Sequence, residues 1–145
     1  MARKEEMEWG DGGTPIFYNV NHSVGRACRN AVDDVLLVQY LLYRIYQHPG
    51  RLPVPRGQMK LDGICGPITQ DWILTFQKGA RKLGYNIFPD GRVEPGEDVK
   101  GSHGHQYTIV WMNANLRKHE PVLYPNLADA PDIPARLATA LRNES

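Results

Sequence analysis

The chain of 145 residues lacks three features that would each indicate a specialised class of protein. Its two cysteines, Cys28 and Cys65, allow at most one disulfide, and we expect a reduced pair. No apolar run can span a bilayer, because the longest, residues 35–46, is short and contains Gln39 and Arg44. Basic and acidic residues nearly balance, 17 against 16, which argues against nucleic acid as a partner. We therefore expect a soluble protein that binds neither a membrane nor nucleic acid.

The N-terminal residues 1–8 do not have the pattern of a secretory leader. Acidic residues follow the first positive charges directly, whereas a leader needs an uninterrupted apolar stretch at that point. We therefore expect synthesis in the cytoplasm without a signal peptide.

The length and the hydrophobic content of 41% are typical of one globular domain with a core of its own. Hydrophobic periodicity divides the chain into three parts. Residues 1–32 form an extension that packs on the core, and within it residues 16–20 read as an extended segment. Residues 33–118 form a helical domain with a loop insertion at 96–106, and residues 119–145 form a connector with a short final helix.

Apolar side chains recur at helical spacing in four segments of the chain. We predict helices at residues 34–47, at 67–83, from about 108 and at 134–142. Asp33 and Asp34 suit the N-terminus of the first helix as caps, and Asp132 suits that of the last. Pro67 suits the first position of the second helix, where its missing N–H costs nothing. The pattern predicts an all-α fold.

The first helix carries apolar side chains on two sides. Leu36, Tyr40 and Tyr43 form a second stripe, about a quarter to a third of a turn from the main one. A helix that is apolar on two sides must be covered on two sides. Either the extension provides the second cover through residues 16–20, or a protein partner docks on these three side chains. We favour the extension because of its apolar content.

Two turns share the pattern Asp-Gly-x-x-x-Pro, one at residues 62–67 and one at residues 90–95. Aspartates in such turns most often accept hydrogen bonds from nearby backbone N–H groups. The recurrence suggests an internal pseudo-repeat.

Five short motifs follow one another along residues 33–116. They are Asp34-Val35, Val38-Gln39-x-x-Leu42, Asp62-Gly63-Ile64-Cys65-Gly66-Pro67-Ile68-Thr69, Phe76-Gln77 and Asp90-Gly91-Arg92-Val93. In this order they resemble the peptidoglycan-binding-domain-like family of bacterial and phage wall proteins. The resemblance implies a three-helix peptidoglycan-binding-like module with N- and C-terminal extensions. It also implies non-catalytic binding of cell-wall peptidoglycan.

The chain departs from the family pattern at three places. Cys65 stands where the family has an aromatic or aliphatic residue, and we interpret it as a small buried apolar side chain. Glu94 replaces the second glycine of the second turn. Residues 96–106 interrupt the direct run into the third helix. The family's wall contacts are expected near these turns, so the insertion alters the surface that would meet a ligand.

Binding a saccharide requires aromatic faces for sugar rings, with amides or carboxylates for hydroxyls. Residues of these types, Asn86 among them, gather around the second turn and the third helix. The candidate ligand-binding residues are Asp62, Gly63, Tyr85, Asp90, Gly91, Tyr107, Trp111 and Asn113. Trp72 and Phe76 follow the stripe of the second helix and are expected in the core.

No catalytic centre, metal or cofactor is expected. His103 and His105 supply two ligands on a loop, whereas a catalytic zinc site needs three. Neither cysteine has a motif that would activate it. A wall binder without a leader implies delivery by phage lysis or by an injection-type secretion machine. The alternative function is a structural adaptor that uses the same fold for protein–protein contacts in a larger assembly.

Overall fold

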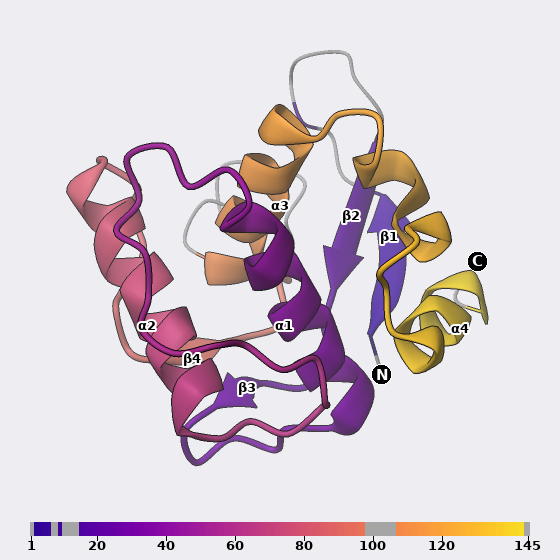
Figure 1. The fold of residues 1–145 in the computed structure, drawn as a ribbon, viewed down its shortest axis with the longest axis horizontal. Helices are drawn as coiled ribbons and strands as arrows, with labels where there is room; N and C mark the ends of the chain where they lie inside the picture. Colours follow the sequence, from indigo (N-terminus) through magenta and orange to yellow (C-terminus); the bar gives the residue numbers. More distant parts are fainter. Residues whose placement is uncertain (1, 7–8, 10–14, 98–106, 144–145) are drawn as a thin grey trace.

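Four α-helices and two small antiparallel sheets build the described part of the computed structural model (Figure 1). The structure describes residues 2–6, 9, 15–97 and 107–143. In chain order the elements are β1 (Arg3–Glu6), β2 (Ile16–Asn19), β3 (Val24–Gly25), α1 (Val32–Ile45), α2 (Pro67–Lys82), β4 (Arg92–Val93), α3 (Thr108–His119), the 3-10 helix η2 (Tyr124–Asp129) and α4 (Ala135–Asn143). In Figure 1, α1 lies in the middle, with α2 on one side and the β1–β2 sheet and α4 on the other.

The prediction of an all-α fold is wrong, because the helices are accompanied by two two-stranded sheets and the fold is mixed α/β. β1 pairs with β2, and β3 pairs with β4, both antiparallel. Sequence periodicity could not reveal three of these strands. β3 and β4 have two residues each, and β1 reads Arg-Lys-Glu-Glu without apolar alternation.

The predicted helices are confirmed, with ends that differ by at most two residues from those the sequence indicates at 34–47, 67–83 and 134–142. The predicted caps of α1 are wrong, because its N-cap is Ala31 and no side chain caps it. Asp34 is fully buried, and its carboxylate accepts the backbone N–H groups of Asn21 and His22 at 3.0 and 3.1 Å. Asp33 forms an ion pair with Arg136 of α4. The two aspartates therefore bind flanking segments to the helix.

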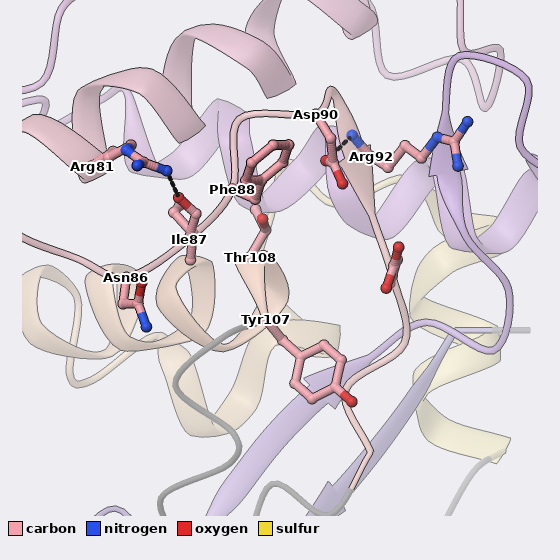
Figure 2. A pocket seen from close by; sticks show the side chains of 9 residues that line it. Arg81, Asn86, Ile87, Phe88, Asp90, Arg92, Tyr107 and Thr108 are labelled. Atoms are coloured by element: carbon pink, nitrogen blue, oxygen red, sulfur yellow. Dashed lines mark hydrogen bonds between the residues drawn. The ribbon is translucent and has the colours of Figure 1, made fainter.

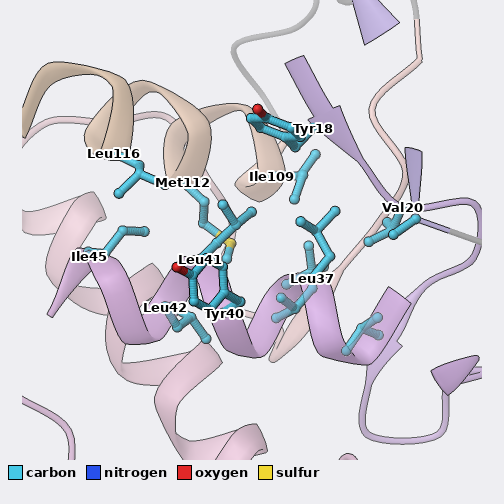
Figure 3. Close-up of a cluster of buried hydrophobic side chains, with 14 of the residues drawn as sticks. Tyr18, Val20, Leu37, Tyr40, Leu41, Leu42, Ile45, Ile109, Met112 and Leu116 are labelled. Atoms are coloured by element: carbon cyan, nitrogen blue, oxygen red, sulfur yellow. The ribbon is translucent and has the colours of Figure 1, made fainter. Parts of the chain in front are cut away.

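The extended segment predicted at residues 16–20 is confirmed as β2 and packs into the core (Figure 3). Phe17, Tyr18 and Val20 are at most 1% exposed. The Tyr18 backbone exchanges two hydrogen bonds with the Asn113 side chain on α3, and its hydroxyl donates to the Tyr124 carbonyl at 2.6 Å. The N-terminal segment is thus part of the core.

The C-terminal segment covers the second stripe of α1 at Tyr40, whereas Leu36 lies beside Gly63 of the first Asp-Gly turn. The Tyr40 hydroxyl donates to Asp132 at 2.5 Å, and burial, followed by this bond, raises the Tyr40 pKa. Arg44 on the same helix pairs with both Asp132 and Glu120. Leu36 and Tyr40 are buried, whereas Tyr43 is half-buried and stacks on Tyr40. Most of this stripe is therefore unavailable to a partner.

The predicted internal repeat is confirmed by a buried glutamine at the centre of each unit. Gln39 of α1 is fully buried. Its amide nitrogen donates to the Asp62 carboxylate, the Ile64 carbonyl and the Thr69 hydroxyl at 3.0–3.1 Å. Its amide oxygen accepts the Gly63 N–H at 2.9 Å. One side chain of α1 therefore holds the first Asp-Gly turn and the start of α2.

Gln77 of α2 repeats the same set of bonds one unit later, and it is also fully buried. Its amide nitrogen donates to Asp90, to the Arg92 carbonyl and to Thr108 at 2.8–3.2 Å, and its oxygen accepts the Gly91 N–H. Gly63 and Gly91, the second residues of the two turns, have φ values of +76° and +74°. A side chain would be strained there, so the turn requires glycine.

We expect Gln77→Ala to lower the free energy of unfolding by about 2–4 kcal/mol, because it leaves several polar groups of the turn without partners. Urea denaturation followed by circular dichroism measures the change. Gln58→Ala is the control, since Gln58 is exposed in a loop. Equal stability of the two variants would contradict the role assigned to Gln77.

Candidate functional site

A hollow of about 410 Å³ lies beside the second Asp-Gly turn, between the last turn of α2 and the start of α3 (Figure 2). Arg81 of α2 forms one wall, and Tyr107 with Thr108 at the start of α3 forms another. The connecting segment 86–94 supplies the remaining lining residues. Gln77 holds this segment in place through hydrogen bonds to the Asp90 carboxylate and the Arg92 carbonyl.

Two aromatic side chains flank the hollow. Phe88 is 72% exposed, which is unusual for a large apolar side chain, and Tyr107 is half-buried. Figure 2 shows the Tyr107 ring at the start of α3, and Phe88 and Asn86 on the connecting segment. Exposed aromatic faces beside polar groups are typical of ligand sites. The flat rings suit the apolar face of a sugar, and the Asn86 amide suits its hydroxyls.

Charged groups of both signs line the same hollow: Arg81 and Arg92, and Asp90 and Glu94. Asp90 has a structural task, because its carboxylate accepts the Arg92 N–H at 2.9 Å and a bond from Gln77 at 3.2 Å. Arg81 donates to the Ile87 carbonyl at 3.4 Å. The balance of charge suits a ligand that carries both carboxylates and amines.

Of the predicted site residues, Tyr107 and Asp90 line this hollow, and Gly91 lies between its lining residues Asp90 and Arg92 without lining it. Tyr85 and Trp111 do not line it. Their rings stack on each other, with centroids 4.2 Å apart and planes at 10°, and both are partly buried against the core.

Asn113 is fully buried, which separates it from any surface ligand. Its oxygen accepts the Tyr18 N–H at 2.8 Å and the Tyr124 hydroxyl at 2.5 Å. Its nitrogen donates to the carbonyls of Tyr18 and Ile109. The sequence carried a signal for this position, because Asn113 is four residues after Ile109 and three before Leu116, on the apolar face of α3.

Asp62 and Gly63 belong to the first turn and do not line the hollow. The first turn and the start of α2 expose two apolar side chains, Ile64 and Ile68, which are 67% and 43% exposed. Cys65 is half-buried and packs against the core, and burial raises the pKa of its thiol. The two turns therefore share an internal bond pattern but present different surfaces.

Sequence reasoning missed Arg81, Phe88, Arg92 and Glu94 as members of the site. Phe88 offered the clearest signal, because it lies in a loop outside every apolar stripe. The two arginines carried no sequence signal for a binding site, because exposed basic residues at a helix end and in a turn are common.

His103 and His105 lie outside the described residues, as does most of the insertion predicted at 96–106. Within the described ranges, no group of three or more His, Cys, Asp or Glu side chains is placed to hold a metal ion. Within the same ranges, none of the helices is both long and apolar enough to cross a membrane.

The pKa of the Asp62 carboxyl is lowered, mainly by the Ile64 N–H and also by the Gln39 amide. A folded-state pKa below the unfolded value stabilises the fold above the unfolded pKa, about 4, and the contribution disappears as the pH falls through the folded value. We therefore expect the stability difference between wild type and Asp62→Asn to shrink on acidification, in urea titrations between about pH 6 and pH 2. Asp71→Asn controls for the lost charge, and a pH-independent difference at Asp62 would contradict the assignment.

Asn113→Ala should lower the free energy of unfolding by about 2–4 kcal/mol, because it leaves buried partners on β2 and in the segment after α3 without a hydrogen bond. Thermal and urea unfolding measure this change. Asn115→Ala, on the same helix but half-buried, is the control. An Asn113 variant as stable as this control would contradict the structural role assigned to the Asn113 hydrogen bonds.

Comparison with known proteins gives no match, whether with models of protein families, with curated proteins or with solved structures.

Proposed function

We propose that this chain binds bacterial peptidoglycan, without hydrolysing it, at the hollow beside the second Asp-Gly turn. One observation carries the proposal: a hollow of about 410 Å³ combines an exposed phenylalanine and a half-buried tyrosine with amide and charged side chains on a hydrogen-bonded turn. Small-molecule sites in proteins have volumes of roughly 300–1,000 Å³ and combine aromatic side chains with polar groups that fix the orientation of the ligand. The order of motifs that resembles the peptidoglycan-binding family supports the same ligand class.

The chemistry of the hollow matches the parts of a wall fragment. Phe88 and Tyr107 offer faces on which a sugar ring can pack, and Asn86 offers donors and an acceptor for acetamido and hydroxyl groups. Arg92 and Glu94, at the edge of the hollow, complement carboxylate and ammonium groups.

The use of the acidic groups supports binding without hydrolysis of the glycan. Glycoside hydrolysis requires two carboxyl groups placed on either side of the scissile bond. Of the two carboxylates that line the hollow, Asp90 is bound to the Arg92 N–H and to Gln77 as part of the turn. Glu94 alone then remains for chemistry. The arrangement suits binding.

The adaptor alternative depended on Leu36, Tyr40 and Tyr43 as a docking surface. Leu36 and Tyr40 are buried inside the chain, which leaves Tyr43 as the half-exposed member of the three. The wall-binding proposal is therefore better supported than the adaptor, and Tyr43 provides a variant that tests one against the other.

We expect Tyr107→Ala to reduce binding to purified sacculi by about tenfold, which corresponds to about 1.4 kcal/mol. Tyr43→Ala is the matched control, because it removes another half-buried tyrosine far along the chain. Co-sedimentation at increasing salt measures the bound fraction, and melting curves verify that both variants fold. The wild-type protein should release no muropeptides during the assay.

Three results would contradict this proposal: no binding of the wild-type protein to sacculi, equal effects of the two variants, or enzymatic release of wall fragments. A loss of protein–protein association with Tyr43→Ala, and no effect on sacculi with either variant, would favour the adaptor instead.

A further inference from the structure

A second hollow, of about 430 Å³, adjoins the first along the edge formed by Arg92 and Glu94. Its other lining residues come mainly from the N-terminal segment, within residues 21–29. The sheet formed by β3 and β4 brings the two segments together, with Val24 opposite Val93 and Gly25 opposite Arg92. The two hollows therefore share Arg92 of β4 and the nearby Glu94 as lining residues.

The backbone around the second hollow is held in place from several directions. The Asn30 side chain exchanges hydrogen bonds with the Gly25 N–H and carbonyl at 2.8 and 2.9 Å. Buried Asp34 binds the N–H groups of residues 21 and 22. Ala27, which lines the hollow, has a φ of +60°, a conformation that costs energy for a residue with a side chain. Such strain persists where the surroundings fix it, and it is common at binding sites.

The groups that line the second hollow differ from those of the first. No aromatic ring other than the imidazole of His22 is among them, so a stacked sugar has no platform. Two arginines, Arg29 and Arg92, line the hollow together with polar Asn21 and Ser23. Glu94 is the one carboxylate among its lining residues, so positive charge exceeds negative charge there. Guanidinium groups with nearby hydroxyl and amide groups suit carboxylates and peptide bonds.

We propose that the second hollow binds the acidic peptide portion of a wall fragment through Arg29 and Arg92, while the first hollow holds its sugar portion. This inference rests on the proposed function. The two portions are covalently joined in peptidoglycan, and the two hollows share one edge, so a single branched ligand can occupy both. The N-terminal segment thereby becomes a part of the binding surface.

Isothermal titration calorimetry with two probes tests the proposal: a wall disaccharide without peptide, and the same disaccharide with its tetrapeptide. Wild-type protein should bind the peptide-bearing probe about tenfold more tightly, an increment expected of a charge-assisted contact. Arg29→Ala should abolish this gain and leave affinity for the bare disaccharide unchanged. Arg26→Ala is the matched control, because Arg26 is an exposed arginine of the same loop that does not line the hollow.

Cys28 provides a second, local measurement, because this free thiol lines the hollow. The peptide-bearing probe should slow alkylation of Cys28, measured by mass spectrometry, and the bare disaccharide should not. The inference is overturned if Arg29→Ala binds both probes like wild type, if it weakens both equally, or if the two probes protect Cys28 equally. If one of these results is obtained and wild-type protein still binds sacculi, the proposed function stands and only this inference is wrong. If wild-type protein does not bind sacculi, the proposed function and this inference are both wrong.

Discussion

A buried primary amide that binds the next turn of the chain is the constraint on which the rest of this structure depends. An amide has two donor hydrogens and two acceptor lone pairs, and a buried one must find partners for them inside the protein. Gln39 and Gln77 meet this requirement with the same three groups: an aspartate, turn backbone and a threonine of the following helix. Each glutamine thereby sets the position of one helix relative to the next.

The second of these amides also determines where a ligand could bind. Gln77 fixes the Arg92 carbonyl, and β4 then presents its other edge to β3. A side chain at Gly25 would overlap the Gly91 carbonyl, so the two segments can approach this closely only with glycine at that position. This contact brings residues 21–29 beside β4, and Arg92 of β4 lines both hollows.

The sequence predicted the helices and both Asp-Gly turns because these features are local. Periodic apolar residues, Pro67 and the Asp-Gly pairs act within a few positions of themselves. It did not predict contacts between distant segments, such as Tyr40 with Asp132 or the burial of Asn113 beneath β2. A polar residue in the core is recognisable only when its partners are known, and those partners lie in segments without periodicity. The sequence predicted two residues of the hollow, Tyr107 and Asp90. Arg92 and Phe88 could be assigned to it only from the three-dimensional structure.

The two units of the repeat show how one internal bond pattern permits different surfaces. Ile64 and Arg92 occupy equivalent positions after their glycines, and so do Gly66 and Glu94. Each turn uses only the backbone at the first of these positions, through a carbonyl bound to the glutamine. The side chain at this position can therefore change without loss of the turn. It is apolar in the first unit and charged in the second. Because the glutamine hydrogen bonds hold both turns through the backbone, the second turn can present the side chains of Arg92 and Glu94 at the surface without loss of these bonds.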